Sequence, residues 1–217
     1  VGDEAGTAIT TGDTNTGVGY KALALTTTGS TNVGLGAYAL QRNTTAAYNT
    51  GVGYDVLGSN TTGDLNVAIG YEALGTNVAG DKSVAIGVQA LYAQNPSGNA
   101  DMYNTAVGYA AGTAVTTGTN NTLIGGTSGD ALTTGSGNTA IGTQNVAVGS
   151  LALDANTTTH DSVAVGYAAL TTATVGTNTA VGSEAMQYTT SGANNVGVGL
   201  QALRANTTGT GNTAVGQ

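Results

Sequence analysis

The chain has 217 residues, of which 12 are Asp or Glu and only 4 are Lys or Arg, so its formal net charge is −8. It contains one His, one Pro and no Cys, Trp or Phe, whereas 36 Gly, 40 Thr and 20 Asn dominate the composition. These numbers exclude a disulfide framework and an ordinary globular core built on large aromatic side chains. The acidic balance argues against nucleic-acid binding and against attraction to an anionic membrane. No run approaches the ~20 apolar residues of a membrane span.

A repeat of 17 residues runs through the chain. It is marked by a glycine that follows a small residue and then a β-branched residue, and we call these positions the marker glycines. They are Gly2, Gly19, Gly36, Gly53, Gly70, Gly87, Gly108, Gly125, Gly142, Gly149, Gly166, Gly182, Gly199 and Gly216. Ten of the thirteen intervals between them are 17 residues long, which predicts a repeat architecture.

The segment before each marker glycine predicts a short strand. An Asn or Ser stands four residues before the glycine and is followed by alternating branched and small residues, as in 66–70. Val67 and Ile69 therefore point to one face of the strand, while Ala68 and Gly70 point to the other. The face of small residues suits close approach by another backbone.

The rest of each unit predicts a second strand and a return turn. An Ala-Leu pair follows the marker glycine, as at Ala73 and Leu74, and we expect it on the second strand. A Thr-Thr-Gly turn follows, in which Gly is expected to take a positive φ. These turn glycines are Gly12, Gly29, Gly63, Gly118, Gly135 and Gly209. Two glycines per unit disfavour a helix, so we expect a parallel β-solenoid in which stacked Asn side chains form a ladder.

The pattern predicts an all-β fold with a single repeat domain over 1–217, comprising about 13 coils. One interval of 21 residues predicts a loop insertion near 94–103. One interval of seven residues predicts a shortened coil near 142–149, or a change of direction between two stacks. Gly112 and Gly129 replace the usual Leu, so we expect the weakest packing around them.

The Val-Ala-Ile-Gly cores at 67–70 and 84–87, each followed by an Ala-Leu pair, resemble a known repeat. It is the left-handed β-roll of YadA-like heads in trimeric autotransporter adhesins, and related phage and bacterial tail-fibre proteins look similar. The resemblance spans the whole chain, with the Thr-Thr-Gly turn looking like an extension of the familiar unit. It implies a homotrimer packed about a central axis and an extracellular location on a bacterial surface or virion. It also implies a structural and adhesive function.

Two features are candidates for contacting a cell-surface glycan or a matrix protein. Tyrosines recur just after the marker glycine, and their rings suit sugar surfaces, although they can equally cover the sheet or fill a subunit seam. These tyrosines are Tyr20, Tyr54, Tyr71, Tyr109 and Tyr167. The insertion is either a recognition loop or a surface bulge, and its candidate contacts are Pro96, Asp101 and Tyr103.

The sequence has few side chains of the kinds that usually act in catalysis, with one His and no Cys. His160 is the only imidazole, and it stands next to Asp161 in a variable turn with no sign of an oxyanion hole. We therefore expect no enzyme activity and no cofactor, and the absence of a calcium-loop motif predicts no metal site. Five Asn-x-Thr sequons follow from the repeat, at Asn43, Asn60, Asn121, Asn156 and Asn206.

Two other functions remain open. Thr-Thr pairs such as Thr44-Thr45 form files along the solenoid, as in ice-binding solenoids. Neighbouring strand residues point to opposite faces, however, so we expect these pairs to serve the turn. Solenoid ends expose strand edges, so a self-assembling filament subunit is the second alternative.

Overall fold

The computed structural model of the chain describes residues 2–141, 145–148, 151–152, 161–173 and 177–217. These residues contain strands and turns but no helix, and the chain divides into two compact units, Val1–Ala140 and Ile141–Gln217. One parallel sheet has eight strands, which span seven turns of the solenoid, and another has five strands, which span four. The solenoid therefore has about 11 turns, spaced about 17 residues apart along the sequence. The predicted all-β parallel solenoid is confirmed. The shortened coil predicted near 142–149 includes residues outside the described ranges.

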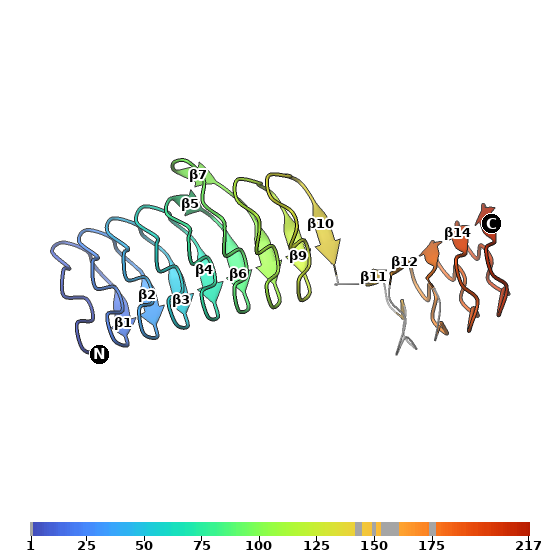
Figure 1. Cartoon of the computed structure of the whole chain (residues 1–217), viewed down its shortest axis with the longest axis horizontal. Coiled ribbons are helices and arrows are strands. Elements are labelled where there is room, and N and C mark those ends of the chain that lie inside the picture. The colour runs from blue at the N-terminus through green and yellow to red at the C-terminus, as the bar shows by residue number, and fades with distance from the viewer. Residues whose placement is uncertain (1, 142–144, 149–150, 153–160, 174–176) are drawn as a thin grey trace. The chain divides into compact units, whose positions relative to one another are not determined.

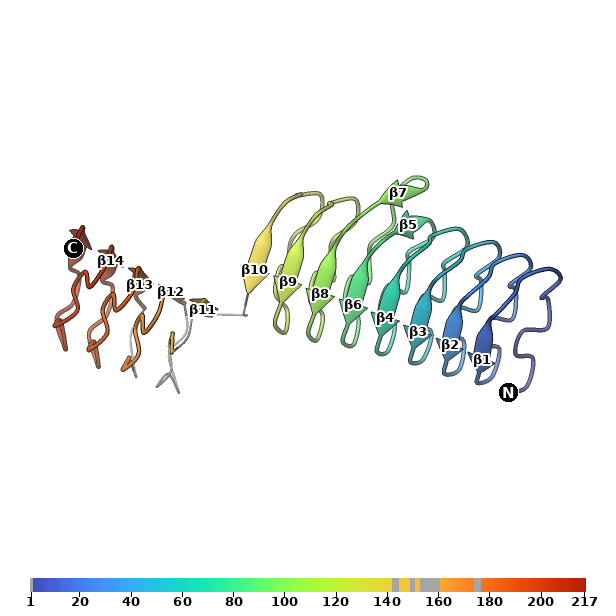
Figure 2. The ribbon, with the colours of Figure 1, turned by 180° about the vertical axis from the view of Figure 1, so that it is seen from behind.

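Each sheet contains one strand from each successive coil, in chain order (Figure 1), and Figure 2 shows the same order from behind. The first sheet comprises β1 Thr16–Val18, β2 Val33–Leu35, β3 Thr50–Val52, β4 Val67–Ile69, β6 Val84–Ile86, β8 Thr105–Val107, β9 Thr122–Ile124 and β10 Thr139–Ile141. The second comprises β11 Asn145–Val148, β12 Ser162–Val165, β13 Thr179–Val181, β14 Val196–Val198 and β15 Thr213–Val215. Two further strands, β5 Gly80–Asp81 and β7 Ala100–Asp101, pair with each other at the insertion.

The strands are short because the marker glycine ends each of them. Gly70 has φ +130°, and a Cβ added there would lie 2.6 Å from the backbone carbon and oxygen of Gly87 in the next coil. No side chain fits into that space, and L-residues rarely adopt that backbone conformation. Each three-residue strand therefore pairs in register with the equivalent residues one coil later, as Val52 does with Ile69.

The small residues of each strand face the interior of the coil, and the branched residues face outward. Ala68 is fully buried, whereas Val67 is half-buried and Ile69 is exposed. The predicted close approach of another backbone is confirmed on the inner side. A Cβ added at Gly34 would lie 3.2 Å from the backbone oxygen of Ala39.

The Ala-Leu pair does not form the predicted second strand. Glu72 and Leu74 have φ of +53° and +52°, so every second residue of this segment is left-handed and the chain folds into consecutive tight turns. The Gly75 N–H donates to the Glu72 carbonyl at 3.0 Å, while the Leu74 N–H donates to Ala90 of the next coil, also at 3.0 Å. The turns place one large apolar side chain of each coil in the core. These include Leu23, Leu40, Leu57, Leu74, Leu91, Leu170 and Met186.

The glycine of the Thr-Thr-Gly turn is not left-handed, contrary to the prediction. Glycine is needed here because there is no space for a side chain: a Cβ on Gly63 would lie 2.5 Å from the carbonyl oxygen of Gly80. The left-handed residue comes two positions later, where Leu65 has φ +60°. Close stacking of successive turns, rather than backbone conformation, therefore selects glycine here.

Gly112 and Gly129 do not leave the predicted weak packing around them. Both keep the left-handed conformation of the Leu they replace, with φ of +62° and +64°. The fully buried Leu123 stands on β9 where other strands carry Ala or Gly. Added Cβ atoms on Gly112 and Gly129 would lie 2.5 and 2.7 Å from its methyl carbons. The side chain of Leu123, on the strand, thus fills the core space that the Leu of the Ala-Leu pair fills in other coils.

Candidate functional site

The outward face of the first sheet carries no charged residue on strands β1 to β9. We define it by the residues one and three positions before the marker glycines of β1 to β9. They are Thr16, Val18, Val33, Leu35, Thr50, Val52, Val67, Ile69, Val84, Ile86, Thr105, Val107, Thr122 and Ile124. All are Thr, Val, Leu or Ile, and Val18 and Ile69 are 44% and 39% exposed. A contiguous apolar surface of this kind is typical of an interaction site.

The second sheet repeats the same surface. Its strands carry branched residues at the same positions, namely Val163, Val165, Thr179, Val181, Val196, Val198, Thr213 and Val215. Each is half-buried or exposed, while the Ala or Gly between each pair lies on the inner side. Because parallel strands repeat at ~4.8 Å, these side chains stand in straight rows along each unit.

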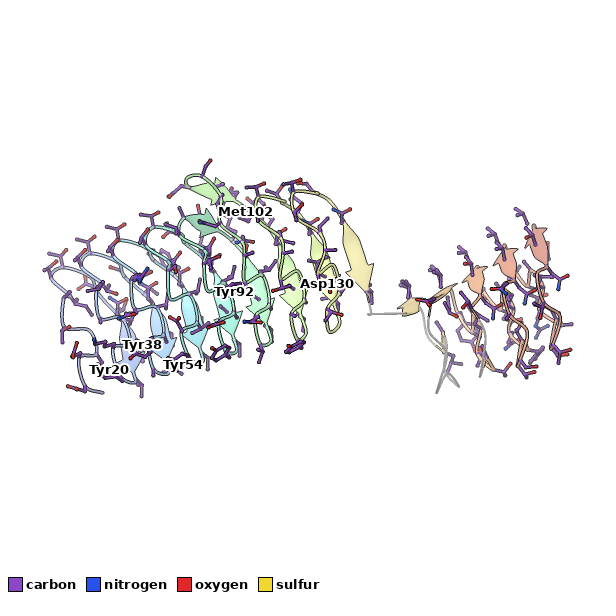
Figure 3. The ribbon with its side chains drawn as sticks, in the orientation of Figure 1. Tyr20, Tyr38, Tyr54, Tyr92, Met102 and Asp130 are labelled. Atoms are coloured by element: carbon purple, nitrogen blue, oxygen red, sulfur yellow. The ribbon has the colours of Figure 1, made fainter. Side chains whose placement is uncertain are left out.

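Four tyrosines form a ladder beside the outward face. The ring centroids of Tyr20 and Tyr38 are 5.3 Å apart, those of Tyr38 and Tyr54 are 5.5 Å apart, and those of Tyr54 and Tyr71 are 5.6 Å apart. Figure 3 shows Tyr20, Tyr38 and Tyr54 along one edge of the strands. We call these four residues the tyrosine ladder. The sequence prediction included three of them and missed Tyr38, which comes two residues after its marker glycine rather than one.

Tyr109 and Tyr167 are the other two predicted tyrosines, and they lie outside the ladder. Tyr109 is 62% exposed, and among the described residues no ring contact is formed by either side chain. The predicted tyrosine stripe therefore has two parts. In the ladder the rings pack on one another, whereas Tyr109 and Tyr167 keep open ring faces of the kind that sugars bind.

The insertion predicted near 94–103 folds back against the two preceding coils. Strand β7 pairs in parallel with β5, and the Asn99 side chain accepts a hydrogen bond from the Thr62 hydroxyl at 2.8 Å. Pro96 is half-buried, while Asp101 and Tyr103 are exposed. A Cβ added at Gly98 would meet nothing within 4 Å, so the tip of the loop stands free.

Asp101 and Tyr103 are brought together around Lys82. The Lys82 ammonium lies 2.8 Å from a carboxylate oxygen of Asp101, and the same oxygen accepts a bond from the Tyr103 hydroxyl at 2.9 Å. The hydrogen bonds from Lys82 and Tyr103 hold the pKa of Asp101 below its ordinary value. Two predicted contact residues thus already satisfy each other's polar groups, and they fasten the insertion to the preceding coil.

Acidic residues stand directly after the return turn in successive coils, as Asp64 and Asp81 do. The Asp64 carboxylate accepts the backbone N–H of Ala47 at 2.7 Å, and the Asp81 carboxylate accepts that of Asp64 at the same distance. Burial raises the pKa of Asp81, and the charges of Asp64 and Asp101 raise it further against the opposing backbone hydrogen bond and Lys82. None of these carboxylates reaches the outward face.

The predicted Asn ladder is present in both units. In the first unit, the Asn32 side-chain oxygen accepts the backbone N–H of Asn49 at 3.0 Å, and Asn49 does the same for Asn66 at 2.9 Å. The amide nitrogen of Asn49 donates to the turn carbonyl of Gly63 at 2.8 Å. The ladder therefore binds the backbone of neighbouring coils as well as other amides.

The sequons belong to these interior networks. Asn43, Asn60 and Asn121 are fully buried, and the Asn60 amide donates to the Asn43 side-chain oxygen at 3.1 Å. Attachment of a glycan to these three side chains is incompatible with the folded coil. Asn206 is half-buried and bonded to Gly209, while Asn156 lies outside the described residues.

The Thr-Thr pairs serve the turn, as expected. The Thr27 hydroxyl donates to the Thr44 carbonyl at 3.1 Å, and the Thr44 hydroxyl donates to the Thr61 carbonyl at 3.0 Å. The first hydroxyl of each of these pairs is therefore committed to the neighbouring coil.

Other kinds of site are not found in the part of the chain that the structure describes. No three His, Cys, Asp or Glu side chains there gather as a metal site would require, and no pocket is formed. Those residues also include no helix of the length and hydropathy that a membrane span needs. His160 lies outside the described ranges, so the expected lack of enzyme activity and cofactor stays a prediction.

Comparisons with known proteins do not assign a family or a function to this chain. No protein-family model, no curated protein and no solved structure matches this chain. The resemblance to YadA-like heads therefore rests on the repeat pattern alone.

Proposed function

We propose that the chain is a structural and adhesive segment of an extracellular fibre, in which copies of the solenoid pack against one another through their outward faces. The observation that carries this proposal is the row of half-buried and exposed Val, Ile, Leu and Thr side chains along the outward face of each sheet. A homotrimer on a bacterial surface or virion is the assembly that the resemblance to YadA-like heads implies.

The occupant that fits this face best is a second copy of the same chain. A partner has to match apolar rows that recur once per coil, and an identical solenoid has that spacing along its whole face. Charge supports the same choice, because the copies carry −8 each but no charged residue lies on the outward face. Like-charged chains can therefore approach along this face with the least repulsion.

Burial also favours association. The interior of each coil contains mainly one Leu or Met with several Ala, and the larger branched side chains of the strands remain partly in water. Thin folds of this kind bury little apolar surface per residue. Packing two or three faces together would remove those side chains from water at about 25 cal/mol per Å² of apolar surface.

Light scattering at several concentrations tests the assembly. A stable species of about three times the 20.9 kDa chain mass is expected. The double variant Val52→Lys/Ile69→Lys, with both changes on the outward face, should be monomeric. The control Thr45→Lys, on an exposed turn, should keep the assembly.

Other masses would redirect the function. A wild-type monomer that persists at high concentration contradicts the trimer, and thermal hysteresis would then test ice binding. A mass that grows with concentration supports the self-assembling filament instead.

The adhesive part of the proposal needs its own test. Tyr109 and Tyr167 have the open rings, so binding of the folded chain to an immobilised glycan series should weaken in Tyr109→Ala and Tyr167→Ala. The variant Tyr38→Ala, within the ladder, serves as the control. If no glycan or matrix protein binds the wild-type chain, the fibre is structural without being adhesive.

A further inference from the structure

We propose that the tyrosine ladder is a site of oxidative cross-linking, in which the rings of Tyr54 and Tyr71 couple to a dityrosine that joins two successive coils. Their ring planes are 9° apart and their centroids are separated by 5.6 Å. The strands before them, β3 and β4, are hydrogen-bonded in register, so the two backbones are held one coil apart. The coupling occurs within one chain and does not depend on self-association.

The composition of the exposed surface directs a one-electron oxidant to tyrosine. The chain has no Cys or Trp, and its two methionines, Met102 and Met186, are 1% and 0% exposed. Tyr54 and Tyr71 are 49% and 45% exposed. Since oxidation follows access, tyrosines react before the thioethers, which are otherwise common targets.

The geometry favours one pair of the ladder. Tyr54 and Tyr71 are stacked, so their ring edges run side by side, and the carbons next to each hydroxyl can meet after a small rotation. The pairs Tyr20–Tyr38 and Tyr38–Tyr54 have interplanar angles of 84° and 76°. An edge-to-face contact points one ring at the centre of the other, so both carbons cannot meet without a large rotation.

The reaction balances with a haem peroxidase and hydrogen peroxide as the oxidant. Each phenol loses one electron and one proton, and the two radicals form a carbon–carbon bond between the positions next to their oxygens. The hydrogens on those carbons move to the oxygens, which restores both phenols. Hydrogen peroxide takes up the two electrons and two protons and becomes two waters. Glu72 hydrogen-bonds the Tyr71 phenol and raises its pKa, so this carboxylate is placed to take the phenol proton.

The test treats the dilute full chain with a haem peroxidase and hydrogen peroxide. Cleavage after Lys and Arg and before Asp then places Tyr54 on peptide 43–54 and Tyr71 on peptide 64–80. The expected result is dityrosine fluorescence, a joined 43–54/64–80 peptide, and a raised urea unfolding midpoint.

Conservative variants identify the reacting rings. Tyr54→Phe and Tyr71→Phe keep the stacked rings but lack one phenol, so each should abolish the joined peptide. Tyr109→Phe should leave its yield unchanged. The joined peptide persisting in Tyr54→Phe would assign the reaction to Tyr48, which shares that fragment. No joined peptide, or dityrosine only between separate chains on a denaturing gel, would also overturn the proposal.

Discussion

Single residues in this fold are selected by what lies one coil away. Most described marker glycines, such as Gly53 and Gly70, have no room for a Cβ, because the backbone of the next marker glycine fills that place. The interior Asn residues are selected because their oxygens accept backbone N–H groups from the neighbouring coil. The structural effect of a substitution is therefore limited to its own coil and the two adjacent coils.

Gly70→Ala should be strongly destabilising. Its Cβ would lie 2.6 Å from the Gly87 backbone, and φ of +130° is unfavourable for alanine. We expect a loss of about 3 kcal/mol in the free energy of unfolding, measured by urea titration. Gly98→Ala is the matched control, since nothing lies within 4 Å of its added Cβ, and equal losses in both variants would contradict the stacking argument.

Thr26→Asn should stabilise the chain. Among the described side chains, the Thr26 hydroxyl is the buried polar group with no hydrogen-bond partner. It occupies the repeat position at which Asn43 accepts the Asn60 amide at 3.1 Å, so an Asn would extend that ladder by one coil. We expect a gain of about 1 kcal/mol in thermal or urea unfolding. Thr26→Val should be neutral or slightly stabilising, and a clear loss there would mean that the hydroxyl has a partner.

At the scale of the element, departures from the repeat occur in compensating pairs. Ser83 stands where the ladder of Asn32, Asn49 and Asn66 would carry its next Asn. Gln94 stands at the next position of a second file of interior amides, Asn43, Asn60 and Asn77. The longer Gln94 reaches across, donating to the Ser83 hydroxyl at 3.1 Å and accepting from Asn104 at 2.9 Å. Leu123 compensates for Gly112 and Gly129 in the same way, within the apolar core.

A double-mutant cycle tests the Ser83–Gln94 pair. Ser83→Asn alone crowds Gln94, and Gln94→Asn alone leaves the Ser83 hydroxyl short of a partner. The double variant restores two ordinary Asn ladders. We expect each single change to destabilise the fold and the double to recover about 1–2 kcal/mol of coupling energy. Strictly additive losses in urea unfolding would show that the two positions act independently.

Asp81 should make the fold relatively more stable in mild acid. Burial raises the pKa of its carboxyl above the ordinary 3.8, so the folded state holds this proton more tightly than the unfolded state. That contribution is fully present below pH 3.8 and is lost as pH rises through the folded pKa. Asp81→Asn should thus gain stability over wild type at pH 7, and the difference should shrink towards pH 4.

Thermal unfolding from pH 4 to 7 measures this difference. Asp101→Asn is the opposite control, because Lys82 lowers the pKa of Asp101. Its carboxylate stabilises the fold above pH 3.8, and this contribution fades only as pH falls through the lowered folded pKa, so the Asp101→Asn difference should stay constant from pH 4 to 7. A pH-independent difference for Asp81→Asn would contradict the assignment.

At the scale of the whole molecule, the outward faces determine how copies of the chain meet. If they associate, unfolding is linked to dissociation and the melting temperature rises with protein concentration. Added salt should maintain or strengthen the assembly, because it screens the repulsion between chains of −8 charge while the apolar contact persists. If sedimentation shows that added salt dissociates the assembly, the contacts between chains are instead ionic. The Val52→Lys/Ile69→Lys variant should melt at one temperature at every concentration.

The sequence by itself determined the parallel solenoid, the register of its strands and the Asn ladder. Residues that recur every 17 positions can be paired with one another only if successive coils are stacked, so periodicity alone leads to files of like side chains. The marker glycines and the insertion followed from the same regularity. Tyr38 and Leu123 were not identified as ladder or core residues because each departs from its usual place in the repeat.

Only the tertiary structure decided which side of each strand is the core. Alternation of branched and small residues looks the same whichever face is inside. The deciding factor lies in the turn, where left-handed residues direct one large side chain, such as Leu74, into the narrow interior. With that space filled, only Ala or Gly fits on the inner side of most strands, and Val67 and Ile69 must face outward. The surface proposed for self-association is therefore a consequence of how little room each coil encloses.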